Sequence, residues 1–147
     1  MIKNSRKTSV LVILGLIVIP FITAFTVEQR YTSYIIMPGG SNLVGEKRNF
    51  SYSNHKITLI PTELENVLQD GYGKYTLVDI DLDKKGLLFW DNKVATGTLK
   101  MRKTGTEYTL YMGNKGKGNF RYSFHTGNSA NWYGSFTANP VYMYSYE

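Results

Sequence analysis

Cysteine is absent from this sequence of 147 residues, and histidine is nearly absent, with only His55 and His125. The lack of cysteine excludes a disulfide framework, a thiolate metal site and an N-terminal cysteine that could carry a lipid. Two histidines without cysteine, and without the spacing of a paired ligand motif, make a poor metal site. We therefore expect no metal and no cofactor.

Acidic residues are missing from the beginning of the chain: none precedes Glu28, whereas residues 1–9 carry three cations. Residues 10–27 follow as an apolar run of about 18 residues, close to the length that spans a bilayer. A basic lead before an apolar run is the signature of export, with the N-terminus left in the cytoplasm. The sequence therefore predicts an apolar membrane-targeting helix in residues 1–27 and an extracytoplasmic domain in residues 28–147.

The export segment is either a cleaved signal peptide or a retained transmembrane signal anchor. Pro20 breaks the helix shortly before Ala24, which favours cleavage after Ala24 and secretion. The lack of a clean A-x-A site and the length of the apolar run favour retention, with the cell membrane spanned once by residues 10–27. An exported domain without disulfides fits a Gram-positive bacterium.

Helical patterning is scarce in the rest of the chain. The one helix that the sequence predicts there covers residues 61–71, where Thr62 and Glu65 match a T-x-x-E capping box. Three apolar residues follow helical spacing on one face: Leu64, Val67 and Leu68.

From Gly73 onward, apolar and polar residues alternate with a period of two. In residues 75–82 the apolar side chains of Val78, Ile80 and Leu82 fall on one side. Residues 87–90 are predicted as a further short apolar strand. Short alternating runs separated by turn residues are typical of an antiparallel meander. The sequence therefore predicts a mainly β domain, a single antiparallel sandwich or small barrel with one short helix.

Metal and phosphate motifs are incomplete. Asp79-x-Asp81-x-Asp83 begins like a calcium loop, but the positions where that pattern needs glycine and glutamate hold Lys84 and Trp90. A solvated strand face is the favoured interpretation. Residues 113–118 form a glycine-rich loop with two lysines, and no predicted helix follows it as a phosphate-binding loop requires.

Catalytic motifs are also weak. Ser123 and His125 share a strand face, but no third member of a catalytic triad stands out in the sequence. A hydrolase would require a cleft that brings one of the histidines to a carboxylate. The sequence therefore favours a protein that is not an enzyme.

Aromatic and basic residues gather in the C-terminal part of the chain. Residues 92–147 contain seven Lys and Arg but two acids, and eleven aromatic residues lie between Tyr108 and Tyr146. If Val141 and Met143 face the core, the tyrosines between and after them form an exposed ladder. The alternative is that the ladder packs against a second sheet or against the predicted helix. Tyrosine suits carbohydrate stacking and protein interfaces. The candidate ligand contacts are Tyr142, Tyr144, Tyr146, Lys115, Lys117 and Arg121.

One stretch resembles a known family. An apolar anchor, then Tyr34-Ile35-Ile36-Met37 and Pro38-Gly39-Gly40, resembles the beginning of the membrane-anchored PDZ/Lon-type proteases of Gram-positive bacteria, and residues 73–77 resemble the strand that follows there. The chain is too short for the PDZ and protease domains of that family, and no residue matches its catalytic Ser and Lys. The resemblance therefore implies an anchored topology and a Gram-positive source, and no activity.

These features together predict a non-catalytic binding domain of the cell envelope. Its ligand is expected to be an anionic wall glycan or an envelope protein, because basic charge attracts anionic partners, and export disfavours nucleic acid. The alternative is a secreted antagonist of the bacteriocin type or its immunity partner, which the small size, basic charge and leader also allow.

Overall fold

The computed structural model describes residues 27–147 except 89–91 and 129–130. The predicted export segment up to residue 26, including the cleavage position after Ala24, lies outside the described residues. Across the described ranges, no helix has both the length and the apolar character that crossing a membrane requires.

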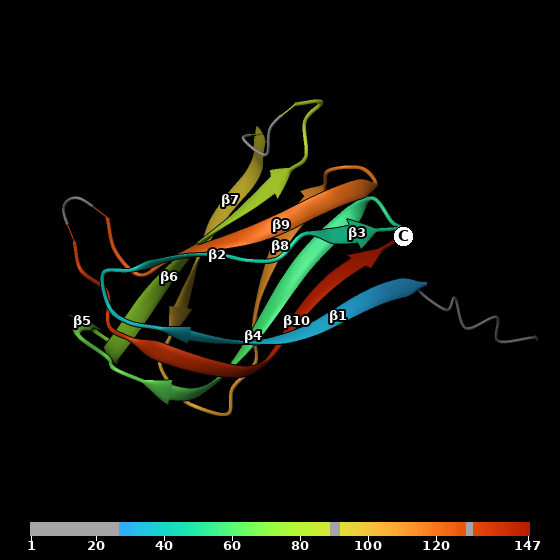
Figure 1. Ribbon diagram of the computed structural model, residues 1–147. Helices are drawn as coiled ribbons and strands as arrows, with labels where there is room; N and C mark the ends of the chain where they lie inside the picture. Colours follow the sequence, from blue (N-terminus) through green and yellow to red (C-terminus); the bar gives the residue numbers. More distant parts are fainter. Residues whose placement is uncertain (1–26, 89–91, 129–130) are drawn as a thin grey trace, which may run out of the picture.

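The described residues form ten strands (Figure 1). They are β1 (Glu28–Met37), β2 (Asn42–Val44), β3 (Arg48–Phe50), β4 (Asn54–Leu64), β5 (Leu68–Asp70), β6 (Gly73–Lys84), β7 (Asn92–Met101), β8 (Tyr108–Asn114), β9 (Gly118–His125) and β10 (Phe136–Tyr146).

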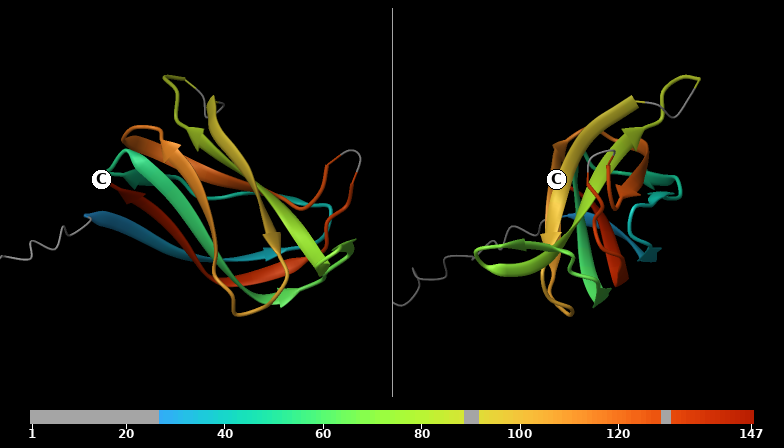
Figure 2. Two further views of the ribbon diagram at one scale, coloured as in Figure 1. Left: turned by 180° about the vertical axis from the view of Figure 1, so that it is seen from behind. Right: turned by 90° about the vertical axis from the view of Figure 1, so that its left-hand side faces the viewer.

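The strands form two curled sheets that lie over one another (Figure 2). Sheet A has the order β1-β10-β4-β8, and sheet B has the order β2-β9-β6-β5, with β3 also paired to β9 and β7 to β6. Every pairing between these strands is antiparallel. On one side of the sandwich β7 lies beside β8, whereas on the other side β1 and β2 are the free sheet edges. The mainly β, sandwich-like fold that the sequence predicted is confirmed.

The core lies between the sheets and follows the period of two. Val78, Ile80 and Leu82 of β6 are fully buried, as the alternation predicted, and Ile57 and Leu59 of β4 face them from sheet A. Successive residues of a strand point to opposite faces, so each sheet keeps a second, outward face. Because the inner faces form the core, the two outer faces and the sheet edges are the surfaces available to a ligand.

The helix predicted for residues 61–71 is wrong, because this segment forms the end of β4 and the short strand β5. Phe136 and Thr137 of β10 pair with Leu64 and Glu63 and extend the sheet A ladder to the end of β4. Instead of closing a capping box, Glu65 accepts hydrogen bonds from the backbone and hydroxyl of Ser135. A helix of two turns is only marginally stable by itself, so the pairing of this segment with β10 determines its structure.

The apolar strand predicted for residues 87–90 is also wrong where the structure describes it. β6 ends at Lys84, and Leu87 and Leu88 are highly exposed in the connection to β7. Residues 89 and 90 lie outside the described residues. Leu87 and Leu88 therefore follow a strand rather than forming one.

Candidate binding surface on sheet A

The tyrosine ladder lies on the outer face of sheet A. Val141 and Met143 of β10 are buried in the core, so the alternate positions Tyr142, Tyr144 and Tyr146 point outward and are half-buried. The rings of Tyr142 and Tyr144 lie 6.0 Å apart between centroids, tilted by 55°. None of the three hydroxyls has a hydrogen-bond partner among the described residues, so all three can bond a ligand.

Two cations from the neighbouring strands lie over these rings. Arg30 of β1 stands 4.7 Å from the centroid of Tyr142, and the ammonium group of Lys56 of β4 lies 4.6 Å from Tyr144 and 5.1 Å from Tyr146. Tyr144 pairs in register with both Arg30 and Lys56. Cation–π contacts at partly exposed sites are worth about 0.5–1 kcal/mol each, which is enough to hold these long side chains against the rings.

The two cations retain much of their capacity for an external anion. Within the described part of the chain Arg30 forms no ion pair, and Lys56 has only the carboxylate of Glu28, at a long 3.9 Å. Further along the outer face, Tyr111 of β8 and Tyr34 of β1 are both well exposed. The face therefore combines phenol rings, hydroxyls and two cations over four adjacent strands.

Of the basic residues predicted to join the tyrosine ladder, Lys115 and Lys117 lie near it and Arg121 does not. Lys115 and Lys117 lie in the β8–β9 connection, at the end of the molecule where Tyr146, Asn54 and Asn114 pair across sheet A. The backbone of Lys115 donates to the carbonyl of Ser53 at that same end, 2.8 Å away. These two lysines therefore border the ladder at its Tyr146 end.

Arg121, in contrast, belongs to the outer face of sheet B. It pairs in register with Asp83 of β6 and lies 3.6 Å from that carboxylate. The two sheets separate Arg121 from the tyrosines, so the structure does not bring it together with the ladder. The sequence could not show this, because β9 and β10 are neighbours in the chain but belong to different sheets.

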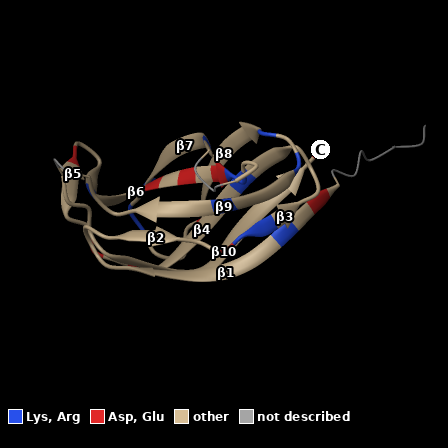
Figure 3. Ribbon diagram, turned by 45° about the horizontal axis from the view of Figure 1, so that its top comes forward, with Lys and Arg blue, Asp and Glu red and all other residues tan. Residues whose placement is uncertain are grey.

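The outer face of sheet B carries a row of charged side chains along β6 (Figure 3). Asp81 accepts from Lys93 at 2.6 Å and from His125 Nε2 at 3.2 Å. Burial raises the pKa of Asp81, but hydrogen bonds from Lys93 and Thr96 and the positive charge of Lys93 outweigh it and lower that pKa. Asp81 and Asp83 of this row each have a cation within 4 Å, and no group of metal-binding residues appears in the described ranges.

The same face lacks the geometry of a catalytic triad. Ser123 donates to Asp83 at 3.1 Å, while His125 contacts Asp81 and, through Nδ1, Asn42 at 2.8 Å. The serine and the histidine are thus each engaged by a different carboxylate, whereas a triad requires the histidine to bond the serine. We find no nucleophile–base pair on this face.

The sequence identified the three tyrosines but missed Arg30, Lys56, Tyr34 and Tyr111. The alternation in β1 and β8 marks Tyr34 and Tyr111 as outward-facing in principle. Arg30 and Lys56 had no such signal. Both pair with Tyr144 of β10, which lies 114 residues after Arg30 and 88 residues after Lys56, and only the folded sheet brings them together.

Comparison with known proteins identifies no family. No family model matches the chain, and no curated protein matches it. Among solved structures, a family two carbohydrate esterase from Cellvibrio japonicus is similar, with a TM-score of 0.32 and 9% sequence identity over 81% of this chain and 36% of that chain. At this level the likeness supports no conclusion about this chain.

Proposed function

We propose that this protein is a non-catalytic binding domain of the bacterial cell envelope, held outside the membrane by its export segment, that binds an anionic glycan on the outer face of sheet A. The observation that carries the proposal is the joint presentation of Tyr142, Tyr144 and Tyr146 with Arg30 and Lys56. Phenol rings contact the apolar faces of sugars, and the cations pair with carboxylate or phosphate groups. The basic loop with Lys115 and Lys117 extends this surface at one end.

A pull-down on purified Gram-positive cell wall tests the proposal. We expect binding that weakens with added salt, because exposed charges are screened at higher ionic strength. We also expect it to fall strongly on wall stripped of its anionic polymers with hydrofluoric acid. The double variant Arg30→Gln with Lys56→Gln should bind about tenfold or more weakly, as expected for the loss of charged hydrogen bonds. The triple change of the ladder tyrosines to Ala should bind equally poorly.

A matched control comes from sheet B, where Lys100 lies 4.1 Å over the ring of Tyr75. The double variant Tyr75→Ala with Lys100→Gln removes a tyrosine and a cation from the opposite outer face and should bind normally. The proposal would be refuted if the sheet A variants and the sheet B control lost wall binding equally. It would also be refuted if binding changed neither with the tyrosines nor with the salt concentration. Undiminished binding to wall stripped of its anionic polymers would point instead to a neutral glycan or a protein ligand.

A further inference from the structure

A second surface feature, independent of the tyrosine face, lies between the free edges of the two sheets. A cleft of about 400 Å³ lies between β1 of sheet A and β2 of sheet B. This volume falls within the range of small-molecule sites, about 300–1,000 Å³. Figure 3 shows these two strands running along neighbouring edges of the sheets. The lining is contributed by β1, β2, the β2–β3 connection, the first residue of β3, β9 and β10.

Hydrogen bonds join the segments beyond both ends of the cleft. At one end the hydroxyl of Thr126 donates to the carbonyl of Pro38 at 2.5 Å, and its backbone N–H donates to Ser41 at 2.9 Å. At the other end the hydroxyl of Tyr31 donates to the carbonyl of Asn49 at 2.6 Å, and the side chain of Gln29 accepts from the backbone of Ser51 at 2.7 Å. An added polypeptide strand needs open ends, so the occupant must be a small molecule.

The two ends of the cleft differ in polarity. Toward the β1–β2 turn the lining is apolar, with Ile35, Leu43 and Phe124. Toward β3 it contains Tyr122, whose hydroxyl is buried, and Arg48. Both Tyr122 Oη and Arg48 Nε are buried donors without a partner among the described residues. Unpartnered buried donors are uncommon in native proteins because they are costly, and here both belong to residues that line the same cleft.

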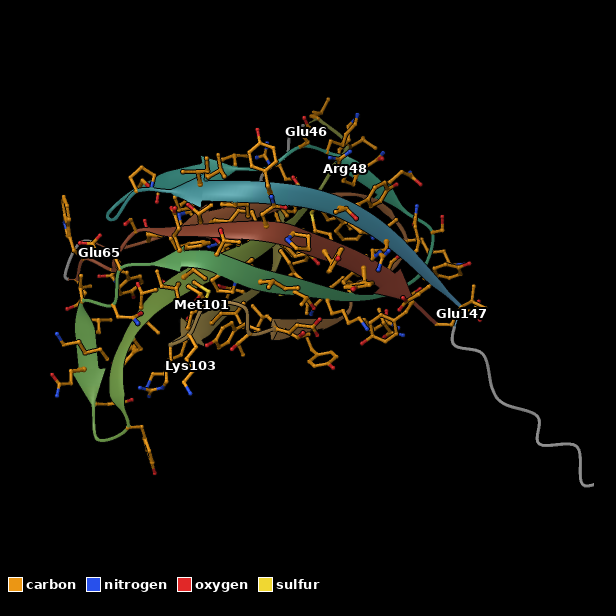
Figure 4. All side chains as sticks on the ribbon, turned by 90° about the horizontal axis from the view of Figure 1, so that it is seen from below. Glu46, Arg48, Glu65, Met101, Lys103 and Glu147 are labelled. Carbon is orange, nitrogen blue, oxygen red and sulfur yellow. The ribbon has the colours of Figure 1, made fainter. Side chains whose placement is uncertain are left out.

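The position of Arg48 suits an anionic head group at that end. Its Nη2 atom pairs with Glu46 at 2.9 Å, leaving Nε unused, and Glu46 itself is largely exposed. In Figure 4 the two labelled side chains lie together beside the edge of β1. The Arg48 side chain is 29% exposed, so a carboxylate can reach the guanidinium from solvent, with Glu46 as the competitor that it must displace.

We propose that this cleft binds a single acyl chain with a carboxylate head group, the chain lying against Ile35, Phe124 and Val141 and the head group accepting hydrogen bonds at the Arg48 and Tyr122 end. The apolar side chains fit the hydrocarbon, and the two unpartnered donors fit the head group. The proposal does not depend on glycan binding, which uses the opposite side of sheet A.

Native mass spectrometry with dodecanoate tests this site in the full chain, purified in a steroid-based detergent that has no alkyl tail of its own. We expect one dodecanoate per chain. Ser33 lines the cleft from β1, so the variant Ser33→Phe fills it and should abolish the bound mass. The matched control Thr32→Phe places the same ring on the outer face of the same strand and should leave the bound mass unchanged.

Two further variants test the head group without changing the volume of the core. Tyr122→Phe should weaken dodecanoate binding about three- to tenfold, as the loss of one hydrogen bond predicts. Glu46→Gln should strengthen it, whereas binding of the uncharged dodecanol should not respond to Glu46→Gln. Absence of bound dodecanoate in the native chain, or equal occupancy in Ser33→Phe and Thr32→Phe, would overturn the proposal, and the wall pull-down would be unaffected by either result.

Discussion

At the scale of single residues, His55 is a titratable side chain set in the core. It is fully buried, its ring lies 4.4 Å from that of Phe120 and 5.2 Å from that of Phe50, and Nε2 lies 2.8 Å from the carbonyl of Gly116. A carbonyl only accepts, so Nε2 carries the proton. Burial lowers the pKa of His55 and the charge of Lys84 lowers it further, while the bond to Gly116 opposes this.

We expect His55 to make the fold less stable as the pH falls below 6.5. A lowered pKa means that the unfolded chain takes up a proton near pH 6.5 while the folded chain does not, so the free energy of unfolding falls from that pH toward the folded pKa. The slope is at most about 1.4 kcal/mol per pH unit for one proton. Urea unfolding at pH 7.5 and pH 5.0 measures it. The variant His55→Gln keeps a donor for Gly116 and should show a smaller pH dependence; an unchanged one would contradict this account.

The residue scale also shows which parts of the site the sequence can reveal. Tyr142, Tyr144 and Tyr146 were predicted because alternation along one strand is a local property. Arg30 and Lys56 were not, because only the pairing of β1 and β4 with β10 gives them a place. Arg121 was wrongly grouped with the tyrosines for the same reason, since nearness in sequence does not say which sheet a strand joins.

At the scale of elements, the chain after β4 crosses the segment before β10 at very close range. A Cβ added at Gly134 would come within 1.6 Å of the carbonyl oxygen of Glu65, and Gly134 also accepts from the buried hydroxyl of Thr76. This crossing stands where the sequence predicted a helix. The capping box is a local sequence signal. The hydrogen bonds between Glu65 and Ser135, in contrast, join residues 70 positions apart. Local sequence patterns therefore could not predict this crossing.

We expect Gly134→Ala to lower the free energy of unfolding by about 2–4 kcal/mol, because the methyl group meets fixed backbone rather than a flexible side chain. Gly71 supplies the control, since a Cβ there meets no atom within 4 Å. Gly71→Ala should change stability by less than about 0.5 kcal/mol. Chemical denaturation of both variants makes the comparison, and equal stabilities would mean that the crossing is looser than described.

At the scale of the whole molecule, the candidate site and the beginning of β1 lie at the same end of the sandwich. Glu28 at the start of β1 pairs with Tyr146 at the end of β10, so the chain enters the domain beside its C-terminal strand (Figure 1). The loop with Lys115 and Lys117 lies at this same end. If residues 10–27 remain in the membrane, these lysines lie close to the lipid head groups, and the tyrosine ladder runs from there away from the bilayer.

Fractionation of expressing cells tests that arrangement. We expect the intact chain of 16.7 kDa in the membrane fraction, resistant to alkaline carbonate, because a span of roughly 20 apolar residues is not removed by breaking ionic contacts. Added protease should digest the domain in protoplasts, since it lies outside. A shorter chain in the medium, with a mass that corresponds to cleavage after Ala24, would show instead that the domain is released. In a released domain, Lys115 and Lys117 would not lie near a membrane. Their position beside Tyr146 would then be the remaining reason to expect them to contact the ligand.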